Sequence, residues 1–192
     1  MAPQIWFIHG ATLTPLCFEW LKGQLRPHVP VDVSYDSKTP LIETISYLRD
    51  EIAKCTTPPL IIGHSLGGVI GAAVAQTVPV AKIATISTPF GGSFAASLAL
   101  WFMPSQLMRD IAQQSPILEA LRKDPPTTPM LSFVTDSGRY ILGEPTDGVV
   151  AVKSQMALNG PRYLTVKVNH FDVLINPYVV SQLNAFFFKD AL

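Results

Sequence analysis

The sequence contains few charged residues. Asp, Glu, Lys and Arg make up 15% of the 192 residues, whereas roughly 25% is typical of a soluble domain. The fourteen basic and fourteen acidic residues cancel, so no net charge attracts nucleic acid or an anionic membrane. We therefore expect no nucleic-acid partner. The 48% apolar content indicates an extensively buried sheet or some exposed apolar surface.

Cysteine and targeting signals are also scarce. Cys17 and Cys55 are too few for a disulfide scaffold, and two free thiols in a reducing compartment are a plainer interpretation than one disulfide. The first eight residues lack the basic region and small-residue cleavage site of a signal peptide. We expect a cytoplasmic protein, with a mature secreted form as the alternative.

Long apolar stretches do occur, but none is an uninterrupted run. Residues 55–81 and 83–108 contain no Lys, Arg, Asp or Glu. Prolines and glycines interrupt both stretches, which a strand, a tight turn and a buried helix explain better than a membrane span. No transmembrane segment is expected.

Short apolar runs alternate with helical patterns along the chain. The expected strands are Gln4–His9, Val31–Tyr35, Leu60–Gly63, Ile83–Ser87, Met130–Thr135 and Tyr163–Val168. The expected helices are Pro15–Arg26, Leu41–Lys54, Leu66–Val78, Pro104–Arg122, Val150–Leu158 and Pro177–Lys189. Such alternation predicts βαβ units and a parallel sheet. The fold class is therefore α/β: one domain over residues 1–192, with about six mainly parallel strands and helices on both faces.

A glycine-rich turn follows the third expected strand. Gly63-His64-Ser65-Leu66-Gly67-Gly68 lies between the apolar run Leu60–Ile62 and a helix of small residues. This G-x-S-x-G pattern, in a strand–turn–helix context, is typical of a nucleophile held on a sharp turn. The glycines leave room for neighbouring backbone, and the helix directs its amide groups at Ser65. A chance glycine-rich turn is the alternative.

With this turn, the sequence resembles the α/β-hydrolase family, in particular small bacterial lipases and esterases. The resemblance extends over nearly the whole chain. It implies a nucleophile at Ser65, followed in chain order by an acid and a histidine. It also implies an oxyanion hole shared between two loops, and it requires neither a metal nor an organic cofactor.

The resemblance selects the other catalytic residues by their place in the chain. Of the four histidines, His170 follows the last expected strand, where the family places its base. The segment Thr146-Asp147-Gly148-Val149-Val150 is similar to the acid-bearing segment of many lipases, so Asp147 is the expected acid. Asp136 and Glu144 have the same chain order and are the alternatives, whereas Asp172 lies outside that order.

Two further segments are expected to surround the site. The His9-Gly10 turn implies an oxyanion hole made by the backbone N–H groups of Ala11 and Leu66. An insertion around residues 90–125 is expected to form a lid or pocket wall, with residues 94–103 as its apolar part. A core helix is the alternative for those residues. The residues expected to contact substrate are Thr12, Phe90, Leu98 and Trp101.

These features predict a serine hydrolase that cleaves carboxylic esters, of lipase or esterase type. The expected partners are a small-molecule or lipid ester and, transiently, a lipid interface. A thioesterase or amidase would use the same residues, and a non-catalytic protein that binds a small apolar ligand is a separate alternative.

Replacing Leu98 or Trp101 with Ala is expected to change acyl chain-length preference more than activity on acetyl esters. Burial of one such side chain is worth roughly 1.5–3 kcal/mol, enough for a tenfold preference or more. Rates on p-nitrophenyl esters of graded chain length measure the effect. If both variants keep the wild-type profile and lose only thermal stability, residues 94–103 belong to the core.

Overall fold

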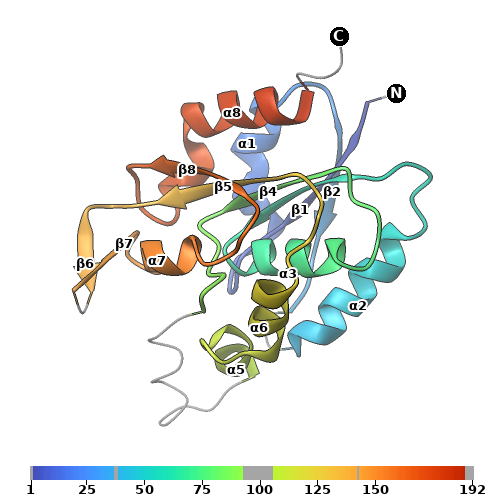
Figure 1. Cartoon of the computed structure of the whole chain (residues 1–192). Coiled ribbons are helices and arrows are strands. Elements are labelled where there is room, and N and C mark those ends of the chain that lie inside the picture. The colour runs from blue at the N-terminus through green and yellow to red at the C-terminus, as the bar shows by residue number, and fades with distance from the viewer. Residues whose placement is uncertain (1, 37–38, 93–105, 142, 189–192) are drawn as a thin grey trace.

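The computed structural model describes residues 2–36, 39–92, 106–141 and 143–188 (Figure 1). The expected pocket wall at residues 94–103 lies outside these ranges, and so do Leu98 and Trp101.

A six-stranded parallel sheet forms the centre of the molecule, in the order β2-β1-β3-β4-β5-β8. Its strands are β1 (Gln4–Ile8), β2 (Val29–Val33), β3 (Leu60–His64), β4 (Lys82–Ile86), β5 (Met130–Thr135) and β8 (Arg162–Val166). Every strand pair in this sheet is parallel. The predicted α/β class is confirmed, together with the number of strands and their direction.

Helices cover both faces of the sheet (Figure 1). One face carries α1 (Glu19–Gln24) and α8 (Pro177–Phe188), and the other carries α2 (Leu41–Ile52), α3 (Leu66–Ala75) and α6 (Pro116–Lys123). The shorter helices are α5 (Gln106–Ile111) and α7 (Val152–Gln155), with 3-10 turns at η1 (Pro15–Phe18) and η2 (Asp172–Ile175).

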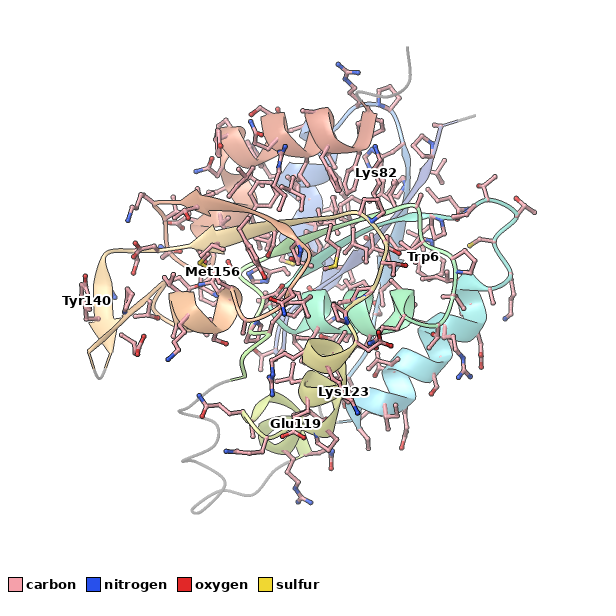
Figure 2. All side chains as sticks on the ribbon, in the orientation of Figure 1. Trp6, Lys82, Glu119, Lys123, Tyr140 and Met156 are labelled. Atoms are coloured by element: carbon pink, nitrogen blue, oxygen red, sulfur yellow. The ribbon has the colours of Figure 1, made fainter. Side chains whose placement is uncertain are left out.

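Strand β1 separates the two apolar cores that these helices create. Ile5 and Phe7 pack in the cluster under α1 and α8, whereas Trp6 and Ile8 pack in the cluster under α2 and α3. Figure 2 labels Trp6 beside the sheet, on the side of α2. The alternation follows from the period of two along a strand, and burial on both faces explains why the strand is apolar throughout.

Two predicted elements differ from the structure. The helix predicted over Pro104–Arg122 is divided in its described part into α5 and α6, because Ser115 precedes Pro116 and adopts an extended ψ of 126°. Proline disfavours helical backbone in the residue before it. An antiparallel hairpin of β6 (Arg139–Ile141) and β7 (Glu144–Thr146) was not predicted. It projects from the sheet with Tyr140 on its outer side (Figure 2).

The strand order reverses between β1 and β3. From β1 the chain continues through α1 to β2 on one side, whereas β3 lies on the other side of β1 and leads into α3. Helices α1 and α3 lie on opposite faces, so the chain leaves β1 and β3 toward opposite sides of the sheet. In open α/β sheets, such a reversal creates a crevice at the carboxyl ends of the strands, where ligands bind.

The start of α3 contacts the end of β1 with no room for side chains. A Cβ on Gly67 would lie 2.0 Å from the carbonyl oxygen of Ile8, and one on Gly63 would lie 2.5 Å from the carbonyl oxygen of Gly67. Both neighbours are backbone atoms, which cannot move without displacing a strand or a helix.

Gly67→Ala is expected to destabilise the protein by about 3 kcal/mol, because the added methyl group overlaps backbone. Gly23→Ala is the control. A Cβ on Gly23, within α1, would have no heavy atom within 4 Å, and alanine is worth about 0.5–1 kcal/mol more than glycine inside a helix. Urea unfolding measures both variants, and equal free energies of unfolding would contradict the close packing of α3 on β1.

Candidate active site

Ser65 occupies a strained turn between β3 and α3. Its φ of 52° and ψ of −120° lie outside the region that non-glycine residues prefer. The backbone N–H of Ser65 donates to the carbonyl oxygen of Ile86 at 2.8 Å, which fixes the turn to the end of β4. The hydroxyl does not cap the helix that follows. Strain at a partly exposed, uncapped serine is typical of a functional site.

The turn after β1 lies against the Ser65 turn. A Cβ on Gly10 would lie 3.1 Å from the Cβ of Ser65. The neighbouring Ala11 is partly buried, and Thr12 is exposed with a φ of 62°. Leu66 is the first residue of α3, where the helix offers its N–H group no internal partner. The structure therefore brings together the two loops that carry the expected oxyanion donors.

His9 and Tyr35 support this turn from the side of β2. The hydroxyl of Tyr35 donates to the carbonyl oxygen of His9 at 2.8 Å. The two rings stack, with centroids 4.4 Å apart and planes 10° apart. Burial lowers the pKa of His9, and it raises the pKa of Tyr35. Both side chains are therefore neutral at pH 7.

His170 and Asp147 form a buried pair at the carboxyl side of the sheet. His170 Nδ1 lies 2.7 Å from Asp147 Oδ2, and the backbone N–H of His170 donates to the carbonyl oxygen of Asp147 at 3.1 Å. Asp147 is 1% exposed and His170 is 3% exposed. A proton on Nδ1 that faces a carboxylate leaves Nε2 as the unprotonated nitrogen of a neutral ring.

Hydrogen bonds keep the Asp147 carboxylate charged despite its burial. The backbone N–H groups of Val149 and Val150 donate to Oδ1 at 2.9 and 2.7 Å, and the hydroxyl of Thr135 donates to Oδ2 at 2.6 Å. Burial acts to raise the pKa of Asp147, but the bonds from His170, Thr135 and Val150 outweigh it and lower that pKa. The site thus holds a stable anion beside the imidazole.

The alternative acids lie elsewhere. Asp136 forms an ion pair with Lys167 at 2.5 Å, and this bond lowers the pKa of Asp136. Glu144 is exposed on β7. Asp172 accepts from the side chain of Asn169 at 2.6 Å. Of the carboxylates weighed from the sequence, Asp147 is the one that reaches the His170 ring.

His64 connects the Ser65 turn to the loop that carries His170. Its Nε2 lies 2.9 Å from the carbonyl oxygen of His170, and the two ring centroids are 4.8 Å apart. Because a carbonyl only accepts, Nε2 must carry the proton. Nδ1 is buried without a hydrogen-bond partner among the described residues. Burial, together with the nearby His170, lowers the pKa of His64 to about 3.

Because Ser65 follows His64 directly, this hydrogen bond joins the Ser65 turn to the loop that carries His170. Within the described residues, no hydrogen bond joins the Ser65 hydroxyl to the His170 ring. Catalytic hydrogen bonds are often long in a resting site and shorten when substrate binds. The arrangement supplies a nucleophile candidate, a base with an oriented tautomer and a fixed anion behind it.

An open cleft of about 460 Å³ lies beside His170, on the side of Asp147. It is lined by Ser137, Arg139, Asp147, Gly148, Val149, Lys167, Val168, Asn169, His170 and Phe171. Val149 and Phe171 are the exposed apolar members, and Arg139 and Lys167 contribute charge. Ser65 does not line this cleft, which is more polar than the acyl pocket expected from the sequence.

The residues expected to contact substrate have different positions. Thr12 lies in the turn next to Ser65, but Phe90 is fully buried in the core cluster with α3 and α6. Phe90 is therefore a core residue of the described structure, and its burial accounts for its large apolar side chain. Leu98 and Trp101 lie outside the described residues.

Three residues near Asp147 were missed from the sequence: Ser87, Thr135 and Gln155. Each is fully buried. The available signal was a polar residue at the end of an otherwise apolar strand, as at Thr135 after Phe133 and Val134. That signal does not identify the partner, because the chain reaches Asp147 only through the unpredicted hairpin.

The described ranges contain no group of three or more His, Cys, Asp or Glu side chains that could hold a metal ion. Cys17 and Cys55 are free thiols. No described helix is long and apolar enough to cross a membrane.

Comparison with known proteins relates this geometry to one family. A model of the alpha/beta hydrolase family matches residues 7–184. The structure is similar to the mature lipase BlEst2 of Bacillus licheniformis, with a TM-score of 0.69 and 16% identity over 99% of this chain and 91% of the lipase. A search of curated protein sequences finds no match.

Two further solved structures have the same fold. A metagenomic carboxyl esterase gives a TM-score of 0.75 at 12% identity, covering 100% of this chain and 76% of the esterase. A lipase-esterase related protein from Clostridium acetobutylicum gives a TM-score of 0.67 at 15% identity, covering 96% of this chain and 94% of the other. At such identities the likeness shows the fold alone.

His64→Gln is expected to make stability less sensitive to acid. The folded protein keeps this ring neutral to about pH 3, whereas the unfolded ring binds a proton below its ordinary pKa of 6.5. The unfolded state therefore binds more protons between these values, and the free energy of unfolding falls as pH falls. Wild type should lose up to about 2 kcal/mol more than His64→Gln between pH 6.5 and pH 5.

Urea unfolding at a series of pH values measures this difference. Gln at position 64 retains a donor for the carbonyl oxygen of His170 but has no titrating group in this range. An identical acid dependence in the two proteins would mean that His64 is not held neutral by the fold.

Proposed function

We propose, from the premise that this chain belongs to the alpha/beta hydrolase family, that it is a serine hydrolase that cleaves carboxylic esters through an acyl-enzyme. The observation that carries the proposal is the buried hydrogen bond of 2.7 Å between His170 and Asp147, in a loop that His64 joins to the turn of the strained and uncapped Ser65. Such a serine needs a base, and such a base needs an oriented tautomer.

In the proposed mechanism, Ser65 Oγ attacks the acyl carbonyl while His170 Nε2 takes its proton. Asp147 holds the tautomer that leaves Nε2 free and stabilises the imidazolium as it forms. The N–H groups of Ala11 and Leu66 stabilise the oxyanion, and losing one such donor typically costs about 10²–10³ in rate. The imidazolium then protonates the leaving alcohol.

The second half of the reaction uses the same groups. His170 removes a proton from water, which attacks the acyl-enzyme, and the collapsing intermediate releases the acid and restores the Ser65 hydroxyl. Each proton moves between Ser65, His170, alcohol and water, so the cycle balances with protein groups alone. Neither a metal nor an organic cofactor is needed.

An ester is the proposed substrate class because related folds support it. The similar proteins are described as a lipase and a carboxyl esterase. The partner proposed here is a small-molecule or lipid ester. Thioester or amide cleavage and ligand binding without catalysis are the competing outcomes of the test below.

Reaction with a fluorophosphonate probe tests the nucleophile. Wild type is expected to be labelled and Ser65→Ala is not, because the probe reacts only with an activated serine. Labelling that survives Ser65→Ala would remove Ser65 from the mechanism. Absence of labelling in folded wild type would favour the non-catalytic alternative.

Hydrolysis of p-nitrophenyl esters tests the acid, with matched variants. Asp147→Asn is expected to lower kcat by about 10³–10⁴, because the imidazole loses its tautomer. Asp136→Asn is the control and is expected to change kcat little, because Asp136 pairs with Lys167 at the surface. Equal losses in the two variants would contradict the assignment of Asp147. Turnover of matched thioesters or amides, but not esters, would change the substrate class.

A further inference from the structure

We infer that Ser87, Thr135 and Gln155 are positioning residues that hold the Asp147 carboxylate in register with His170. The inference rests on the proposed function, in which Asp147 orients the base. It assigns a role to a buried polar cluster that ester chemistry alone does not require.

The cluster forms a continuous chain of short contacts behind the carboxylate. Ser87 Oγ lies 2.8 Å from Thr135 Oγ1, which lies 2.6 Å from Asp147 Oδ2. The side-chain nitrogen of Gln155 lies 3.4 Å from the same Oδ2. Ser87, Thr135 and Gln155 are 0% exposed, so water does not compete for these bonds.

The hydrogen bonds that join Ser87, Thr135 and Asp147 have one donor-to-acceptor direction. Thr135 has a single hydroxyl proton, and the nearest acceptor is the charged Oδ2 of Asp147, because Gln155 Oε1 is farther away at 3.2 Å. The Thr135 oxygen must then accept from Ser87. The order is Ser87 hydroxyl to Thr135 hydroxyl to Asp147 carboxylate, in which each bond strengthens the next.

Gln155 fixes the backbone at the end of β5. The N–H of Thr135 donates to Gln155 Oε1 at 2.8 Å, and Gln155 Nε2 donates to the carbonyl oxygen of Thr135 at 2.9 Å. The opposite amide orientation would bring two donors together, so the side-chain orientation is determined. Gln155 therefore ties α7 to the residue whose hydroxyl holds Asp147.

Ser87 shows backbone strain at the other end of the chain. Its φ is 53°, and its N–H donates to the carbonyl oxygen of Phe133 at 3.0 Å. A non-glycine residue keeps such a conformation only when its surroundings enforce it. Here the turn directs the Ser87 hydroxyl at Thr135 instead of at solvent.

The other ionisable groups around the pair remain the same in every variant below. His64 faces His170 and is neutral. Arg139 and Lys167 line the cleft beside Asp147, and Lys167 pairs with Asp136. A change in the Asp147 titration can therefore be attributed to the bond that was removed.

Thr135→Val tests the inference, because valine has the shape of threonine without the hydroxyl. We expect kcat on a p-nitrophenyl ester to fall about tenfold with KM unchanged, as expected when one hydrogen bond to a charged group is lost. Thr135→Ser should recover most of that loss. Thr85→Val is the matched control, because Thr85 is equally buried and donates to Ser132 at 2.9 Å, away from Asp147.

A second measurement needs no substrate. Carboxyl carbon NMR of the resting protein follows the Asp147 titration, with Asp147→Asn to identify the signal. Thr135→Val is expected to raise the pKa of Asp147 by about one unit, because the charged form loses a donor. Ser87→Ala removes the donor to Thr135 but no direct bond to the carboxylate, so it should raise the pKa of Asp147 less. Thr85→Val should leave that pKa unchanged.

The two measurements separate this inference from the proposed function. A shifted Asp147 titration in a protein without esterase activity would overturn the proposed function and leave the anchoring of Asp147 intact. If the pKa of Asp147 is the same in Thr135→Val as in wild type, the inference is wrong. It is also wrong if Thr135→Val and Thr85→Val lose equal amounts of kcat. If Thr135→Val does not fold, the Ser87→Ala titration decides by the same criterion.

Discussion

Backbone contact between the start of α3 and the end of β1 is the constraint on which the site depends. A Cβ on Gly67 would lie 2.0 Å from the carbonyl oxygen of Ile8, so only glycine permits the approach. Because helix and strand meet there, the chain must turn sharply at Ser65, which takes a φ of 52°. The same contact puts the Gly10 turn beside Ser65. The proposed nucleophile and the proposed oxyanion donors therefore share one geometric cause.

Charge is distributed unevenly in this fold. The two cores are apolar, yet the carboxyl edge between β4 and β5 buries a carboxylate, two hydroxyls and an amide: Asp147, Ser87, Thr135 and Gln155. Such groups are costly to bury unless each is hydrogen-bonded. Here Asp147 accepts from two backbone N–H groups, a hydroxyl and the His170 ring. A sequence with only 15% charged residues thus keeps a hydrogen-bonded anion buried beside the His170 ring.

The sequence predicted those features that have local causes. Apolar runs between glycines and prolines located all six strands of the sheet within about two residues, because burial on both faces imposes that composition. The turn around Ser65 was recognisable because its glycines are consecutive in the chain. The break at Ser115-Pro116 had a local signal that was overlooked, and the β6–β7 hairpin, three residues per strand, was too short to produce a pattern.

Contacts between distant segments could not be predicted in the same way. His170 and Asp147 are separated by 23 residues, and Thr135 and Gln155 by 20. Neither spacing corresponds to a helix or hairpin period, so only the folded sheet brings these side chains together. The buried position of Phe90 is similar, since its apolar character is equally compatible with a pocket and with a core.

The three fixed polar atoms of His170 determine which atom can exchange a proton. Its N–H is held by the carbonyl oxygen of Asp147, its carbonyl oxygen by His64 Nε2, and its Nδ1 by Asp147 Oδ2. Nε2 is the remaining polar atom. The contact with His64 comes from the Ser65 turn itself, so a hydrogen bond fixes the His170 loop to that turn. We infer that the proposed base and nucleophile are held by one connected set of hydrogen bonds, with Nε2 as the atom left free to take the proton of Ser65.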